Sequence, residues 1–267
     1  MDPLRASGRL WQEMTWPEVE ASQRQDPVVL FPVGSIEQHG PHLPLDTDIR
    51  SAWEVCVRTS EAVTDFPVIV APPLWAGFSP HHMGFPGTLT LRYETFTHVI
   101  EDVCSCLHQH GFHRIVIVNG HGGNIAILGA IVYKLLEHRI RAAAVTYFSL
   151  ITDRLREVGT SEMGGMWHAC EMETSTMLYF APGLVRRDKL VREIVDPATP
   201  FFTTDFRRPG TAQFPMLARS DTASGVYGDP LVASEEKGRA IIEAAVVRLS
   251  DFVRDFRTLD VTVPVET

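Results

Sequence analysis

Apolar and polar positions repeat with two different periods along this chain, and together they predict strands that alternate with helices. Short runs rich in β-branched residues predict buried strands at residues 28–33, 68–71, 114–118 and 142–148. Apolar residues at helical spacing predict helices at about 49–64, 93–110, 124–138 and 169–180. This order is typical of βαβ units. We therefore expect an α/β fold with a mainly parallel sheet and helices on both faces, a three-layer αβα arrangement.

Two segments near the C-terminus depart from this alternation. Residues 234–256 read as one long amphipathic helix, with Ser234 as the N-cap and two glutamates directly after it. Residues 196–228 are rich in Pro, Gly, Ser and Thr and show no period. We expect this second segment to be a long loop over a functional site or part of a subunit contact.

Composition and charge narrow the class of protein. The chain has 267 residues, of which 45% are hydrophobic and 21% charged, enough for a single domain over residues 1–267. A formal net charge of −9 argues against nucleic acid as a partner, because such a surface needs clustered Lys and Arg. The absence of a long apolar run or a secretory signal leads us to expect a soluble, cytoplasmic protein without membrane contact. The four cysteines form no CxxC pair, and we expect buried free thiols.

The first segment with dense chemistry is residues 34–48, GSIEQHGPHLPLDTD. It follows a predicted strand, and ligands of open α/β sheets bind at the carboxyl ends of strands. It offers donors suited to Zn²⁺, Mn²⁺ or Fe²⁺, namely Glu37, His39, His42, Asp46 and Asp48. In an extended segment the side chains of Glu37 and His39 leave the same face. The alternative is a polar loop in which Asp46 or Asp48 caps the next helix.

The second segment is residues 119–124, NGHGGN, which also follows a predicted strand. Its glycines permit close backbone approach around His121. A Gly-rich turn of this kind could instead hold a phosphate, but the spacing matches neither common phosphate-binding motif. We interpret Asn119 and Asn124, together with Asp46, as partners that orient metal ligands.

The third segment is residues 167–175, WHACEMETS, at a predicted helix start. His168 and Glu171 are three residues apart and would share a helix face, whereas Glu173 would lie about 140° round the helix from His168. Acidic residues in a first turn also favour the helix dipole, so either glutamate could be structural.

These segments, together with FPGTLTL at residues 85–91, resemble the ordered signature segments of the creatininase (creatinine amidohydrolase) family. The likeness runs from about Trp16 to Leu184. It implies a creatininase-like αβα fold, divalent metal ions, two per chain (Zn, Mn or Fe), and a homo-oligomer, often a hexamer.

Residue by residue, the resemblance implies that Glu37 and His121 bind one metal and that His39 binds the other. Asp48 would bridge the two ions. His168 would match the family histidine that polarises or protonates the substrate, and we keep Glu171 beside it as a catalytic candidate.

The motif departs from that of creatininase at one metal ligand. Creatininase has a metal-binding Glu two residues after the histidine of the NGH motif, and this chain has Gly123 there. Glu173 is the first candidate for the missing ligand and Glu171 the second. Either His81 or His82, just before the FPGTLTL segment, could line the pocket or be a solvated loop residue.

The function implied by the resemblance is metal-dependent hydrolysis of a C–N bond, an amide and possibly a cyclic one, in a small molecule. Within the same family the alternative is a peptidase resembling the mycofactocin-precursor peptidase, or a formamide deformylase. A different class of function would be a non-catalytic ligand-binding module, in which NGHGGN binds phosphate without metal.

Overall fold

A parallel sheet forms the centre of the protein, for which we describe a computed structural model covering residues 9–195, 199, 201–208 and 210–264. Its strands are β1 (Val28–Val33), β2 (Val68–Val70), β3 (Arg114–Asn119) and β4 (Ala143–Thr146), in the order β2-β1-β3-β4. Each neighbouring pair is parallel. The sheet predicted from the sequence is therefore confirmed, with each strand within a few residues of its expected bounds.

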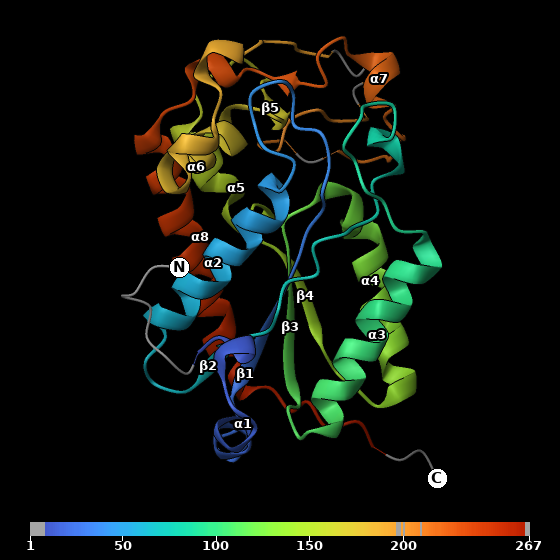
Figure 1. Ribbon diagram of the computed structural model, residues 1–267, viewed down its shortest axis with the longest axis vertical. Coiled ribbons are helices and arrows are strands. Elements are labelled where there is room, and N and C mark those ends of the chain that lie inside the picture. The colour runs from blue at the N-terminus through green and yellow to red at the C-terminus, as the bar shows by residue number, and fades with distance from the viewer. Residues whose placement is uncertain (1–8, 196–198, 200, 209, 265–267) are drawn as a thin grey trace.

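Helices cover both faces of this sheet (Figure 1). One face carries α2 (Thr47–Ala62) and α8 (Glu235–Thr258), and the other carries α3 (Tyr93–Gln109) and α4 (Ile125–Lys134). Side chains of β1 alternate between two apolar cores: Val28 and Leu30 pack on the side of α2 and α8, and Val29 and Phe31 on the side of α3 and α4. This arrangement confirms the predicted three-layer αβα fold.

The remaining elements lie around these layers. A two-stranded antiparallel sheet joins β5 (Met166–His168) to β6 (Tyr227–Gly228), and α6 (Glu171–Phe180) packs against α8. The shorter α-helices are α1 (Trp16–Gln23), α5 (Thr152–Val158) and α7 (Ala218–Asp221). Short 3₁₀ helices lie at Trp11–Glu13, Pro80–His82, Gly122–Asn124, Leu135–His138, Ser149–Ile151, Pro182–Leu184, Arg187–Lys189 and Pro230–Val232.

The helix expected at residues 169–180 begins two residues later than its pattern suggested. His168 ends strand β5, and the helix starts at Glu171. Between them Ala169 adopts a φ of 49°, the left-handed region that a non-glycine residue seldom occupies. His168 and Glu171 are therefore not on one helix, and the expectation that they share a helix face is wrong.

The C-terminal expectations are largely met. Helix α8 begins after Ser234, whose hydroxyl accepts a hydrogen bond of 3.2 Å from the Lys237 amide. The stretch 196–228 is mostly irregular where it is described, apart from α7 and β6, and its residues 196–198, 200 and 209 lie outside the described part.

Two other expectations concern the whole chain. Of the cysteines, Cys106 is exposed, contrary to expectation, and the others are buried. Within the described residues, no helix is both long and apolar enough to cross a bilayer.

The contact between α6 and α8 requires a glycine, and this yields a first prediction. A Cβ atom at Gly238 of α8 would lie 1.9 Å from the carbonyl oxygen of Ser175 on α6. Gly129, within α4, has nothing within 4 Å of such an atom. We expect Gly238→Ala to lower the free energy of unfolding by about 1–3 kcal/mol through overpacking. Gly129→Ala should raise it by about 0.5–1 kcal/mol because alanine favours a helix interior.

Chemical denaturation of both variants and of the unchanged protein measures the two free energies of unfolding. Equal changes in the two variants would show that the close approach of α6 and α8 does not constrain the fold.

Candidate metal centre

Side chains from four separate elements meet at the carboxyl end of the central strands. Glu37 and His39 come from the loop after β1, and His121 follows β3. Asp48 lies in the first turn of α2, and Glu173 lies in the first turn of α6. Each of these residues is at most 6% exposed. The structure thus brings together all five residues expected as metal ligands.

Two glycines allow the first turn of α2 to rest directly on the strand ends. A Cβ atom at Gly34 would lie 2.6 Å from the Ile49 Cα, and one at Gly120 would lie 2.3 Å from the Asp48 carbonyl oxygen. Any larger residue would push α2 away from the sheet. These glycines therefore set the position of Asp48 between β1 and β3.

The carboxylate of Asp48 lies between two histidines. Its Oδ1 is 3.1 Å from Nε2 of His39, and its Oδ2 is 2.9 Å from Nδ1 of His121. The same Nδ1 of His121 lies 3.2 Å from Oε2 of Glu37. One oxygen of Asp48 thus faces each side of the cluster, as a bridging ligand requires.

Glu173 completes the side of the cluster that contains His39. Its Oε1 is 3.9 Å from Nε2 of His39, and ligand atoms of His39, His168 and Glu173 all lie within 4.8 Å of one another. Burial, together with the carboxylates of Asp48 and Glu37, raises the pKa of Glu173 to about 7 against the opposing effect of His39. This is the behaviour of a carboxyl group that lacks a matched cation.

Glu171 lies elsewhere, and its expected role in catalysis requires correction. Its carboxylate accepts hydrogen bonds from the main-chain amides of Thr160 and Ser161 and from the Lys237 ammonium group of α8. These partners occupy both of its oxygens. Glu171 therefore ties α6 to α8 and to the preceding loop, and we do not retain it as a catalytic residue or a ligand.

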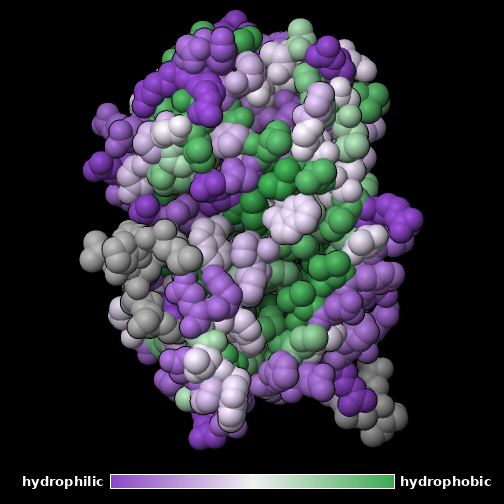
Figure 2. All heavy atoms as spheres, viewed as in Figure 1, coloured by the Kyte–Doolittle hydropathy of each residue, from purple (hydrophilic) through white to green (hydrophobic). Residues whose placement is uncertain are grey.

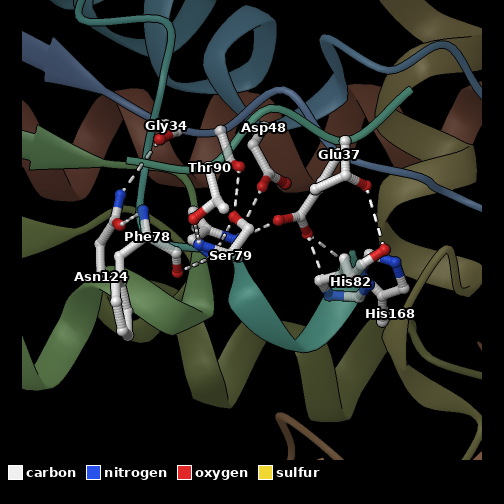
Figure 3. A network of polar contacts seen from close by, with 12 residues as sticks. Gly34, Glu37, Asp48, Phe78, Ser79, His82, Thr90, Asn124 and His168 are labelled. Carbon is white, nitrogen blue, oxygen red and sulfur yellow. Dashed lines mark hydrogen bonds and ion pairs between the residues drawn. The ribbon is translucent and has the colours of Figure 1, made fainter. Parts of the chain in front are cut away.

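His82 and Gln38 are buried neighbours of the cluster. Nε2 of His82 is 3.3 Å from Oε1 of Glu37, and Nδ1 of His168 is 3.7 Å from the same oxygen. Figure 3 shows both histidines on one side of the Glu37 carboxylate, with Asp48 and Ser79 on the other. Sequence reasoning left His81 and His82 undecided and overlooked Gln38, although it stands between two predicted ligands.

The expected orienting residues divide into two groups. Asn119 accepts a hydrogen bond of 3.1 Å from the amide of His121 and donates one of 2.7 Å to its carbonyl oxygen. Asn124 bridges Gly34 and Phe78 across the strand ends. Asp46, by contrast, forms an ion pair with Arg50 one turn along α2. The expectation that Asp46 orients a ligand is therefore corrected.

The charges of the cluster fit a divalent cation. Four carboxylate oxygens are buried and form no hydrogen bond of ordinary geometry: both of Glu37, Oδ2 of Asp48 and Oε2 of Glu173. Leaving a buried charged acceptor unsatisfied is costly. Carboxylate oxygens mixed with imidazole nitrogens are donors that Zn²⁺, Mn²⁺ and Fe²⁺ accept.

The histidines of the cluster reflect the same surplus of negative charge. Burial alone would lower the pKa of His39, but Asp48 overrides it and raises that pKa to about 10. Burial is likewise outweighed at His121, where Glu37 and Asp48 raise the pKa well above its ordinary value. Protons on these rings provide positive charge that a bound metal would replace, so metal binding releases protons.

A carboxylate and imidazole cluster at the carboxyl edge of a doubly covered parallel sheet is the arrangement expected of a metal-dependent enzyme of the α/β class. The family model described as "Creatininase: Creatinine amidohydrolase" matches residues 12–253. The chain therefore belongs to the creatininase family, as its motifs predicted.

Two curated relatives match this chain over most of their length. The mycofactocin precursor peptide peptidase of Mycolicibacterium smegmatis is 35% identical over 231 residues, which cover 85% of each chain. The creatinine amidohydrolase of Pseudomonas putida is 31% identical over 261 residues, covering 91% of this chain and 95% of that one.

Solved structures agree with this assignment. A crystal structure of creatinine amidohydrolase (creatininase) superposes with a TM-score of 0.82 at 27% identity, covering 96% of this chain and 100% of that one. A structure described as manganese creatininase gives a TM-score of 0.79 at 28% identity, with 92% and 98% covered. A mutant creatininase of Zn-Zn type gives 0.77 at 28% identity, with 94% and 98% covered.

The contrast between the two neighbouring glutamates of α6 yields a second prediction. We expect Glu173→Gln to lower the content of bound divalent metal while the free energy of unfolding of the metal-free protein changes little. Glu171→Gln should preserve metal content and lower that free energy by about 1–3 kcal/mol, because buried hydrogen bonds to a carboxylate are weakened.

Metal analysis and denaturation of both variants test the contrast, and the pH dependence supplies a control. Burial opposes the effect, but Lys237 and the loop amides lower the pKa of Glu171. Its stabilising contribution is therefore present above the pKa of an unfolded glutamate and is lost as pH falls through the lowered folded value. A loss of metal in Glu171→Gln, with full metal in Glu173→Gln, would reverse the assignment.

Proposed function

We propose that this protein hydrolyses an amide C–N bond with the help of two divalent metal ions held by the described cluster. One ion would be held by Glu37, His121 and Asp48, and the other by His39, Asp48 and Glu173. The observation that carries the proposal is the position of Asp48, whose two oxygens face His39 and His121. When bound, the ions would supply an activated water and polarise the substrate carbonyl.

The choice of Glu173 as a ligand of the second ion is supported by the surroundings of Gly123. A Cβ atom at this position would lie 2.4 Å from Nε2 of His121 and 2.9 Å from Cε1 of His81. A longer side chain has no room there without moving both rings. The carboxylate expected at this position in creatininase is thus replaced, in our proposal, by Glu173 from α6.

His168 lies beside the cluster as a neutral ring held in one tautomer. Its Nε2 lies 2.8 Å from the main-chain oxygen of Gln38, which can only accept a hydrogen bond, so Nε2 carries a proton. Burial, reinforced by the charge of His39, lowers the pKa of His168 to about 3, which keeps the ring neutral. Nδ1 is then unprotonated, and in our proposal it accepts the hydrogen bond of the attacking water and orients that water at the cluster.

In our proposal the substrate is an amide of a small molecule or a short peptide, a class that two relatives support. One relative is a peptidase for a peptide precursor, and another acts on creatinine. A metal analysis and a screen of lactams, formamides and short peptides with Zn²⁺, Mn²⁺ and Fe²⁺ test the proposal. A protein that binds no stoichiometric metal and hydrolyses none of these would instead be a binding module.

We also propose a homo-oligomer, in keeping with the family resemblance. Large apolar side chains of α4 and the 3₁₀ helix after it are exposed: Ile125 by 43%, Tyr133 by 76% and Leu136 by 40%. Apolar residues also gather elsewhere on the surface, in the middle of the face that Figure 2 shows. Surfaces of this kind favour association. Light scattering of the purified protein measures the number of subunits.

Two neighbouring aspartates provide a third prediction. Asp48→Asn keeps the size of the side chain but removes the charge shared between both ions, so we expect loss of at least one ion and a fall in turnover of about a thousandfold. Asp46→Asn should cost less than about threefold, because a partly exposed ion pair with Arg50 contributes little.

Metal content and turnover of both variants are measured under one condition, on the amide that the screen identifies. If Asp46→Asn proves the more damaging change, the bridging role assigned to Asp48 is incorrect.

A further inference from the structure

His82 and Gln38 lie against the proposed metal ligands without taking part in the steps described above. His82 ends the 3₁₀ helix Pro80–His82 and is 1% exposed. The centroids of its ring and the His168 ring are 4.3 Å apart, and both rings face Glu37 (Figure 3). Such complete burial of polar groups beside a charged cluster calls for a defined hydrogen-bond network.

The side-chain nitrogen of Gln38 has three polar neighbours but only two protons. It lies 2.9 Å from the Gly225 carbonyl oxygen, from Nδ1 of His82 and from Nε2 of His168. Nε2 of His168 already carries the proton that it donates to the main-chain oxygen of Gln38, so it cannot accept. Gln38 therefore donates to Gly225 and to Nδ1 of His82.

The orientation of the Gln38 amide is fixed from its other end. Oε1 accepts a hydrogen bond of 2.9 Å from the main-chain amide of Gly40. If the side-chain amide of Gln38 were flipped, its NH₂ group would face the main-chain N–H of Gly40, and its oxygen would face the carbonyl oxygen of Gly225. Neither pair can form a hydrogen bond. The assignment thus follows from main-chain groups whose donor and acceptor roles cannot change.

The tautomer of His82 follows directly. Because Nδ1 accepts from Gln38, the ring carries its proton on Nε2, 3.3 Å from Oε1 of Glu37. Oε1 of Glu37 thus faces this N–H group at ion-pair distance, while Oε2 faces His121 and the cluster. Glu37 is then held with one oxygen for the histidine and one for a metal ion.

We propose that Gln38 and His82 form a positioning relay, which orients the Glu37 carboxylate toward a metal ion through one oxygen and leaves Nδ1 of His168 free. The relay rests on the proposed function, because it orients a ligand of the proposed metal centre. A hydrogen-bonded histidine that orients a ligating carboxylate affects metal affinity through the geometry of that carboxylate.

The same network excludes a different role for His82. Ligand atoms of Glu37, His82 and His168 lie within 4.8 Å of one another, a set that could itself hold a metal. A nitrogen that carries a proton has no lone pair to give to a metal. The relay therefore assigns His82 to positioning and not to ligation.

Two variants at one position separate these roles, with Co²⁺ alone as the probe. His82→Ala removes the donor to Glu37, and we expect the dissociation constant for Co²⁺ to rise roughly tenfold to a hundredfold. Its visible spectrum should change as Glu37 offers a second oxygen. His82→Gln retains an N–H group of similar reach, and both the affinity and the spectrum should stay close to those of the unchanged protein.

Gln38→Met tests the other half of the relay, since it keeps the length of the side chain and removes both N–H donors. We expect the same direction of change as in His82→Ala. Unchanged Co²⁺ affinity and spectrum in His82→Ala and Gln38→Met would overturn the relay. Equal losses in His82→Gln and His82→Ala would overturn it as well and make His82 a ligand.

The unchanged protein serves as the reference for the proposed function itself. If it binds no Co²⁺, the metal centre fails, and with it the proposed function. If it binds Co²⁺ and the variants do not differ from it, only the relay fails.

Discussion

Three carboxylates, Glu37, Asp48 and Glu173, are buried within reach of each other, and the rest of the site depends on how their charge is balanced. Like charges a few ångströms apart repel strongly where water is excluded. The raised pKa values of His39 and His121 show that the protein compensates with protons on imidazole rings. Burial, together with the charges of Asp48 and Glu37, still raises the pKa of Glu173 to about 7 despite the opposing charge of His39. Divalent cations between the carboxylates and imidazoles would complete the compensation, and in our proposal they also provide the chemistry.

The fold makes this concentration of charge possible because each proposed ligand lies in the first turn of a helix or in a loop directly after a buried strand. Strands β1 and β3 are buried from both faces, and they deliver their loops to one edge of the sheet. Gly34 and Gly120 allow α2 to bring Asp48 onto that edge, and α6 brings Glu173 from the side of α8. The ion pair of Glu171 with Lys237 holds α6 on α8, so one glutamate stabilises the helix and its neighbour faces the cluster.

Much of the fold and of the site could be predicted from the sequence. The spacing of apolar residues in strands and helices is a local property, and so is the position of each motif directly after a strand. The five proposed ligands were found in this way with help from the family resemblance. The separation of His168 from Glu171 was not, since it depends on Ala169 adopting a left-handed conformation between strand β5 and helix α6. His82 was one of two candidates for lining the pocket, but its role and that of Gln38 were beyond reach, because they arise from contacts with Gly225 and His168, which are far away in sequence.

The central claim is that two ions share Asp48, and the position of bound metal tests it most directly. Crystals of the protein grown with Mn²⁺ or Zn²⁺ would reveal the ions by their anomalous scattering. We predict two peaks, one between Glu37, His121 and Asp48 and one between His39, Asp48 and Glu173. No peak, or a peak enclosed by Glu37, His82 and His168 with none beside Asp48, would contradict the account.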